Sequence, residues 1–243
     1  PRPTTLVDTF AGGGSVSLTA VFEKLVDRAI MIELDENVAS VWKTVFGGSG
    51  GRLAERIMHF NCTADAVAEV LNSTPLTFED QAFQTLVMNR TRYGGIIAPG
   101  AAPVKKGENG HGISSRWYPD TLARRVRAIS GKNEDFFFIN ASGMDFLEKA
   151  PKYKNVVYYI DPPYTVAGKR LYNHTEIDHK KLFYLASRLH GDILMTYDNS
   201  EQIKSLAREF QFQVKQIPMR STKHELKYEL LIGRNLDWTG LPA

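Results

Sequence analysis

The segment Asp161-Pro162-Pro163-Tyr164 brings together residue types that could hold a ligand. It follows the apolar run 155–160, which reads as a buried strand, and open α/β sheets bind ligands just outside the carboxyl ends of their strands. Proline lacks a backbone donor, so the carbonyls near Pro162 remain able to accept hydrogen bonds from elsewhere. The segment therefore offers a carboxylate, a carbonyl and a flat ring at one point of a cleft. The alternative is a strand-ending turn with a tyrosine on the surface.

A glycine-rich turn near the N-terminus could approach a nucleotide-like ligand. The β-branched run 4–10 is typical of a strand, and Ala-Gly-Gly-Gly-Ser follows at 11–15, with Ser15 in the capping position of a helix. Such a turn lets the backbone come close to a ligand. The next strand, 28–34, carries Glu33 about 20 positions later, where a carboxylate can bond a ribose. The last glycine of a GxGxxG pattern is missing, which argues against a dinucleotide but not against an adenosine.

A third polar group follows the apolar strand 135–140. Asp145 and Phe146 lie just beyond its end. The acid could accept a hydrogen bond from the exocyclic amine of an adenine while the ring packs on the face of the base. The alternative is that Asp145 caps the helix that continues through Glu148.

Composition and charge narrow the class of protein. The chain has 243 residues, 43% of them hydrophobic, enough for one large α/β domain or a core with a small insertion. We find no apolar run long enough for a membrane span and no leader pattern. Cys62 is the single cysteine, which excludes an internal disulfide and suits a reducing cytoplasm. His174 and His179 lack the spacing of metal ligands, so we expect no metal site.

The positive charge is concentrated in one part of the chain. Between residues 90 and 132 there are nine Lys or Arg and two acids, a balance of 9 − 2 = +7, whereas the whole chain carries +3. A surface that meets phosphates has this kind of asymmetry, although a solvated helix and loop could also produce it. The stretch 94–118 within it is rich in glycine and has little apolar periodicity, which indicates a long functional loop or a disordered one.

The remaining pattern alternates strands with helices, which predicts an α/β fold with a doubly wound, mainly parallel sheet and a C-terminal antiparallel hairpin. The predicted strands are 4–10, 28–34, 135–140, 155–160, 192–197, 213–218 and 228–232. The predicted helices are 16–25, 37–46, 53–71, 78–92, 119–130, 178–190 and 200–210. We expect a catalytic domain from 1–75 and 133–243, with 76–132 as an inserted recognition region.

These motifs occur in an order that resembles the Dam-type adenine-N(6) DNA methyltransferases, from about Thr4 to Asn235. The matching segments are Leu6-Val-Asp-Thr-Phe-Ala-Gly-Gly-Gly-Ser15, Glu33, Asn89-Arg-Thr-Arg-Tyr-Gly-Gly95, Asp145-Phe146, Asp161-Pro-Pro-Tyr164 and the closing segments 220–223 and 228–231. Their joint order is more specific than any one motif. Family members usually begin with a Lys-Trp-Ala-Gly-Gly-Lys-like stretch, whereas here only Pro1 to Pro3 precede the first strand, so we expect that this element is missing or trimmed.

The resemblance implies a Rossmann-like methyltransferase fold, S-adenosylmethionine as cofactor and double-stranded DNA with a flipped target base as substrate. The cofactor residues that it implies are Asp8, Phe10, Ala11, Gly12, Gly14, Ser15, Glu33, Asp145, Phe146 and Asp161. The catalytic residues that it implies are Asp161, Pro162, Pro163 and Tyr164. The residues that we expect to contact DNA are Arg90, Arg92, Tyr93, Lys105, Lys106, Arg116 and Lys223. A restriction endonuclease counterpart would accompany some such enzymes.

The chemistry fits these residue types. The amine of adenine is a weak nucleophile because its lone pair is delocalised, and two acceptors that draw its protons out of plane would return that density to nitrogen. Flipping the base costs a few kcal/mol, and one aromatic stack recovers about 1–3 kcal/mol of it. Methylation of cytosine N(4) or of RNA adenine uses similar geometry, although Asp161 favours adenine because cytosine enzymes more often have Ser there. A catalytically silent relative would bind nucleic acid through the basic segment alone.

Overall fold

The computed structural model describes residues 2–98, 100–107, 110–150, 153, 155–163, 177–220 and 226–240. The strands are β1 (Thr5–Asp8), β2 (Arg28–Glu33), β3 (Phe136–Asn140), β4 (Val156–Ile160), β5 (Asp192–Asp198), β6 (Gln213–Arg220) and β7 (Leu226–Gly233). The helices are α1 (Ser15–Phe22), α2 (Glu36–Thr44), α3 (Gly50–His59), α4 (Ala64–Asn72), α5 (Phe78–Thr91), α6 (Pro119–Ser130), α7 (Gly143–Lys149), α9 (His179–Arg188) and α10 (Glu201–Glu209). A π-turn spans Val45–Ser49, and short 3-10 turns span Tyr93–Gly95, Gly112–Arg116, Asn133–Asp135 and Asp237–Thr239.

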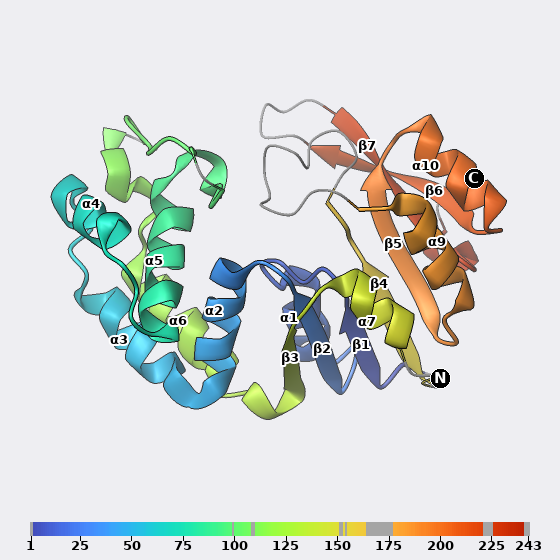
Figure 1. Cartoon of the computed structure of the whole chain (residues 1–243), viewed down its shortest axis with the longest axis horizontal. Coiled ribbons are helices and arrows are strands. Elements are labelled where there is room, and N and C mark those ends of the chain that lie inside the picture. The colour runs from blue at the N-terminus through green and yellow to red at the C-terminus, as the bar shows by residue number, and fades with distance from the viewer. Residues whose placement is uncertain are drawn as a thin grey trace. The chain divides into compact units, whose positions relative to one another are not determined.

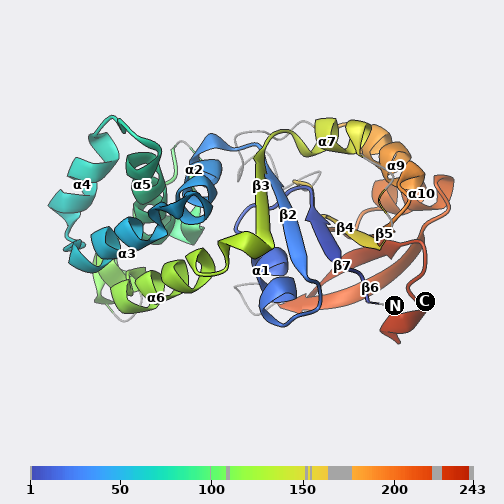
Figure 2. The ribbon, with the colours of Figure 1, turned by 90° about the horizontal axis from the view of Figure 1, so that it is seen from below.

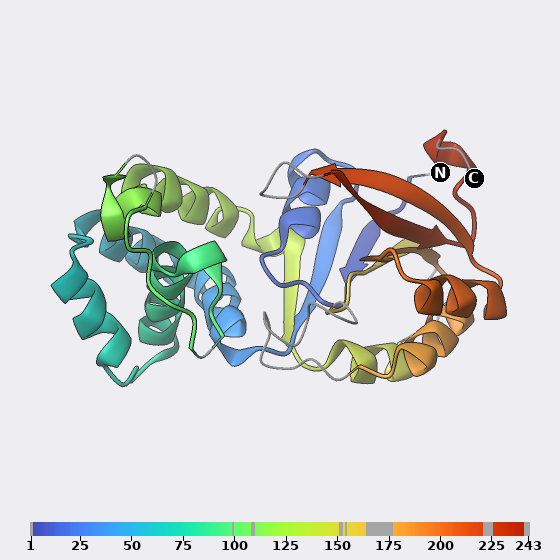
Figure 3. The same ribbon diagram turned by 90° about the horizontal axis from the view of Figure 1, so that it is seen from above.

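The seven strands form one sheet in the order β3-β2-β1-β4-β5-β7-β6. The β1–β2, β1–β4 and β4–β5 pairs are parallel, and β7 pairs antiparallel with both β5 and β6. Figure 2 shows α7, α9 and α10 along one face of the sheet and α1 on the opposite face, and Figure 3 shows the same arrangement. The predicted doubly wound, Rossmann-like fold with a terminal antiparallel hairpin is confirmed.

The chain divides into two compact units (Figure 1). Among the described residues, the first unit contains those up to Glu33 and those from Ala141 onward, and the second contains those in 34–140. The second unit is wider than the predicted insertion 76–132, because it also includes α2, α3 and α4. That this unit recognises the target remains a prediction.

The core of the first unit is centred on the parallel strands. Tyr158 of β4, Tyr197 of β5 and Phe183 of α9 are fully buried there. Burial of rings of this size removes a large apolar area from water and supplies much of the stabilising free energy. The carboxyl ends of β1, β2 and β4 therefore lie on a rigid platform, which is where the predicted site residues occur.

The second unit has its own core of helices. The ring of Phe60 packs edge-on against Phe83 of α5 and Trp117, with ring centroids 5.2 Å away from it in both pairs. The structure divides the helix predicted over 53–71 into α3 and α4, with an extended backbone at Phe60. Thr63 begins the second of them, and its hydroxyl accepts a hydrogen bond from the Ala66 amide at 3.3 Å. The single long helix was therefore wrong.

No helix in the described part of the chain is long and apolar enough to cross a bilayer.

Candidate active site

Asp8 ends β1 as a buried carboxylate, with 2% of its surface exposed. The Ser17 hydroxyl donates to its Oδ2 at 2.7 Å, whereas Oδ1 is buried and has no hydrogen-bond partner among the described residues. Burial raises the pKa of Asp8 to about 6, and repulsion from Asp161 and Glu33 adds to this, against the lowering effects of the Ser17 hydroxyl and the Phe10 backbone amide. A carboxylate in this position gains free energy from a cation beside Oδ1.

The glycine turn after β1 places its backbone near Glu33. Gly12 and Gly14 have φ of 48° and 66°, in the left-handed region that favours glycine. Gly14 is the residue before the first turn of α1, and Ser15 makes no side-chain cap, so the predicted capping role of Ser15 is wrong. The Gly12 amide donates to Oε2 of Glu33 at 2.8 Å. Glu33 thus contacts the turn, a contact that the sequence did not predict, and its contact with a ribose remains a prediction.

The space beside the turn is open within the described structure. A Cβ built on Gly12 or Gly13 meets no atom within 4 Å. Ala11 is buried, and its amide donates to the Ile32 carbonyl at 2.9 Å, which fixes the turn against the end of β2. The turn is therefore anchored on one side and accessible on the other.

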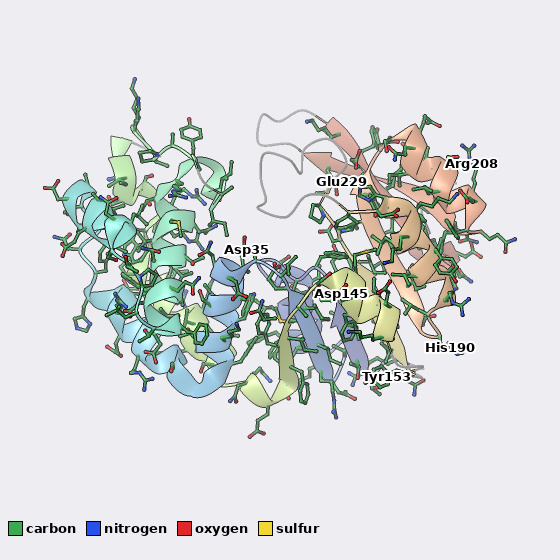
Figure 4. The ribbon with its side chains drawn as sticks, in the orientation of Figure 1. Asp35, Asp145, Tyr153, His190, Arg208 and Glu229 are labelled. Carbon is green, nitrogen blue, oxygen red and sulfur yellow. The ribbon has the colours of Figure 1, made fainter. Side chains whose placement is uncertain are left out.

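The helix that carries Asp145 begins directly against this turn. A Cβ on Gly143 would lie 2.2 Å from the Thr9 carbonyl oxygen and 3.1 Å from the ring of Phe10, so only glycine fits here. The Ser142 hydroxyl caps α7 by accepting from the Asp145 amide at 3.3 Å, which rules out the alternative in which Asp145 is the cap. The Asp145 side chain is exposed at the start of α7 (Figure 4). Phe146 is half-buried and packs on the core.

Asp161 follows β4 and is tied to β5. The Thr196 hydroxyl donates to its Oδ1 at 2.7 Å. Burial raises the pKa of Asp161 and repulsion from Glu229 adds to this, whereas the hydroxyls of Thr196 and Tyr159 lower it. Figure 4 labels Glu229, which lies on β7. Asp161 and Asp8 are close enough to repel each other, so the predicted catalytic acid and the predicted cofactor acid share one site.

The prolines of the same motif fix its start. Pro162 is buried and Pro163 is half-buried. Tyr164 lies outside the described residues, so its predicted stacking on a base remains a prediction.

Sequence reasoning missed three hydroxyls that support these acids, namely Ser17, Tyr159 and Thr196. Ser17 lies in the first turn of α1, and its hydroxyl points back to Asp8 at the end of β1. Thr196 is a polar residue in the otherwise apolar stretch Ile-Leu-Met-Thr-Tyr of β5, and that interruption was the available signal. The partner of Thr196 became evident only from the strand register.

The predicted DNA-binding residues other than Lys223 lie in the second unit and differ in their surroundings. Arg92 donates to the carbonyls of Ile97 and Ala98 at 3.0 and 3.3 Å, and Arg116 donates to the carbonyl of Arg92 at 3.2 Å. These two arginines hold the loop after α5 together. Tyr93, Lys105 and Lys106 are exposed, and Lys223 lies outside the described residues.

Arg90 is placed differently. Its Nε is buried without a hydrogen-bond partner among the described residues, and burial lowers its pKa, with further lowering from Arg116 and Arg125. Three guanidinium groups that repel one another favour the arrival of an anion. Among the described residues, no group of three or more His, Cys, Asp and Glu side chains could hold a metal ion.

Comparison with known proteins identifies a family. The model of the D12 class N6 adenine-specific DNA methyltransferases matches residues 1–221. Among curated proteins, none matches this sequence.

Solved structures give weaker similarities, which carry no argument about the reaction. TrmK of M. capricolum in complex with S-adenosylhomocysteine is 7% identical, with 96% of this chain and 62% of that chain covered and a TM-score of 0.42. Precorrin-6y C5,15-methyltransferase of Geobacter metallireducens is 8% identical, with 96% and 80% covered and a TM-score of 0.40. An rRNA methyltransferase of Streptomyces viridochromogenes is 14% identical, with 96% and 77% covered and a TM-score of 0.39.

The expected resemblance is thus confirmed over residues 1–221: this chain is a methyltransferase that belongs to the D12 class of N6 adenine-specific DNA methyltransferases.

Proposed function

We propose that this protein transfers a methyl group from S-adenosylmethionine to the exocyclic amine of an adenine that is flipped out of double-stranded DNA. One observation carries the proposal. Asp161, the predicted acceptor for the amine, is held by Thr196 at the end of β4 and lies close to Asp8, which ends β1 beside the glycine turn. An acceptor for the substrate and a candidate binding site for the donor therefore share one edge of one sheet.

The residues around the turn fit the proposed cofactor. S-adenosylmethionine carries a cationic ammonium and a cationic sulfonium, and it supplies an activated methyl group when bound. Asp8 has a buried oxygen with no partner among the described residues, and the space beside Gly12 and Gly13 is open. Asp8 would hold the ammonium, Glu33 the ribose, and Asp145 with Phe146 the adenine of the cofactor. Phe10, Ala11, Gly14 and Ser15 would line the same turn.

Asp161 and the Pro162 carbonyl would act on the target amine by accepting its two protons in hydrogen bonds. This pulls the amine out of conjugation and returns electron density to its nitrogen. The nitrogen would lose one proton as its bond to the methyl carbon forms and the bond from that carbon to sulfur breaks, with the electron pair of that bond remaining on sulfur, and Asp161 would receive the proton. Burial raises the pKa of Asp161, which strengthens it as a proton acceptor.

DNA would be held through the basic second unit. Arg90 has a buried Nε without a partner among the described residues and lies near Arg116 and Arg125. A phosphate would accept a hydrogen bond from this nitrogen and would offset the repulsion among the three guanidinium groups. Exposed Lys105 and Lys106 would add contacts that depend on salt. A counterpart restriction endonuclease and a cytoplasmic location remain predictions from the sequence.

Labelled-methyl transfer tests the proposal. The purified chain is incubated with methyl-labelled S-adenosylmethionine and either genomic DNA that lacks adenine methylation or RNA transcribed from it. The product is then identified by nucleoside analysis. We expect label in N6-methyldeoxyadenosine, no label in RNA, and none with Asp161→Ala, which should still bind the cofactor in a calorimetric titration. Label in N4-methyldeoxycytidine or in RNA would replace the proposed substrate, and full turnover by Asp161→Ala would remove the proposed role of that acid.

A further inference from the structure

We propose that Thr196 is a positioning residue, which holds one oxygen of Asp161 so that the other oxygen faces the target amine. This inference rests on the function proposed above. It adds a residue from β5, a strand to which neither the sequence motifs nor the family assignment gave a role.

The register of the sheet sets the contact. In the parallel β4–β5 pair, Ile160 lies opposite Met195, so the next residues along both strands are Asp161 and Thr196. The Thr196 hydroxyl lies 2.7 Å from Oδ1 of Asp161, the distance of a strong hydrogen bond to a carboxylate. Threonine is β-branched and rotates little about χ1, so a strand residue of this type presents its hydroxyl in a fixed direction.

A second hydroxyl lies beside this contact. The Tyr159 hydroxyl lies 3.2 Å from Oγ1 of Thr196 and also hydrogen-bonds the Asp161 carboxylate. An ionised carboxylate only accepts, so the Thr196 proton is donated to Asp161. Thr196 therefore binds Oδ1 of Asp161, and the proposal assigns Oδ2 to the incoming amine.

The charges around Asp161 disfavour its ionised form, which the Thr196 hydroxyl stabilises. Within the described part of the chain, Asp161 is repelled by Asp8 of β1 and by Glu229 of β7, and the hydroxyl groups of Tyr159 and Tyr197 also interact with it electrostatically. The hydroxyls of Thr196 and Tyr159 oppose the rise in the pKa of Asp161 that burial causes. Without Thr196, the acid would keep its proton to a higher pH, and a protonated carboxyl accepts poorly from an amine.

Substitutions at Thr196 separate positioning from packing. Thr196→Val keeps the shape of the side chain but removes the donor, and we expect kcat to fall about ten- to a hundredfold, with the KM values for cofactor and DNA changed little. The acid limb of the pH–rate profile should move to higher pH. Thr196→Ser restores a hydroxyl and should recover most of the rate. Tyr159→Phe should change both readouts in the same direction by less, and it serves in place of Thr196→Val if that variant fails to fold.

The matched control is Thr85→Val in α5, where a buried hydroxyl bonds the Gln81 carbonyl at 2.8 Å far along the chain from both acids. It should leave the pH–rate profile unchanged. A readout without turnover is the ¹³C titration of labelled aspartate carboxyls, in which Asp161 should lose its proton at a higher pH in Thr196→Val than in the wild type. A wild type that transfers no methyl to DNA would refute the proposed function, whereas an unchanged titration and pH–rate profile in Thr196→Val would refute the role of Thr196.

Discussion

Asp8→Asn should make the stability of this protein less sensitive to pH, because the buried carboxylate of Asp8 opposes folding when it is ionised. Burial raises the pKa of Asp8 from 3.8 to about 6. Below about pH 4 the acid is protonated in both the folded and the unfolded chain, so it costs nothing. Between about pH 4 and pH 6 the folded chain keeps a proton that the unfolded chain has lost, and stability falls as pH rises. Above that window the penalty is complete.

The size of the effect follows from the shift. About two pKa units correspond to about 3 kcal/mol, of which about 2 kcal/mol is lost between pH 4.5 and pH 7.5. The variant does not titrate, but its buried amide leaves a donor unpaired at a cost of about 1–3 kcal/mol. That cost does not depend on pH. We therefore expect the stability of Asp8→Asn relative to the wild type to rise by about 2 kcal/mol from the lower to the higher pH.

The assay must report on the first unit, since a protein of two compact units need not unfold in one step. Urea titrations at the two pH values, followed by hydrogen exchange of peptides from β1 and β4, meet this need. Ser17→Ala is the companion variant: it removes the hydroxyl that lowers the pKa of Asp8 in the folded chain, so the upper end of the window of falling stability should move to higher pH while the lower end stays near pH 4. S-adenosylmethionine should stabilise the wild type at the higher pH and Asp8→Asn much less.

A relative stability of Asp8→Asn that stays constant within about 0.5 kcal/mol across this range would show that Asp8 is not a strained anion, because linkage requires the change. The inference that Oδ1 of Asp8 binds a cation of the ligand would then also be refuted.

Two further predictions concern the same edge of the sheet. Gly143→Ala should lower stability by about 1–3 kcal/mol in urea unfolding, because its Cβ would lie 2.2 Å from the Thr9 carbonyl oxygen. Gly13→Ala is the matched control, since its Cβ meets no atom within 4 Å: it should leave stability unchanged but weaken binding of S-adenosylmethionine in calorimetry, and unchanged binding would place the cofactor elsewhere. Tyr164→Phe should keep the rate of DNA methylation, whereas Tyr164→Ala should lose about 1–3 kcal/mol of stacking, or about five- to 150-fold in kcat/KM. Equal rates for the two variants would exclude stacking by this ring.

The positions of the two principal acids could be predicted from the sequence because the carboxyl ends of parallel strands meet at one edge. Asp8 and Asp161 each follow an apolar run, and nothing more was needed to expect them together. The role of Thr196 could not be found in this way. It depends on which residue of β5 lies opposite the end of β4, and a shift of one residue would turn its hydroxyl to the other face.

The predicted helix boundaries were wrong at two places, the connection between α3 and α4 and the start of α1. Residues 60–63 have no glycine or proline, so the helical pattern continues through them in the sequence. In the structure α3 ends at His59, Phe60 is extended with its ring against Phe83 and Trp117, and Thr63 caps α4. At the glycine turn, Ser15 was a reasonable cap by type, but the left-handed Gly14 makes the entry to α1 instead.

The distribution of carboxylates explains why the site costs stability and why its hydroxyls matter. Repulsion from Asp161 and Glu33 disfavours ionisation of Asp8, and repulsion from Glu229 disfavours ionisation of Asp161. The proposed cofactor would bring positive charge to the Asp8 end of this group. Asp161 must instead stay ionised while a neutral amine approaches, and Thr196 and Tyr159 oppose its protonation. The two acids thus need different partners. Asp8 needs a cation that arrives with the ligand, whereas Asp161 needs hydrogen-bond donors that belong to the sheet.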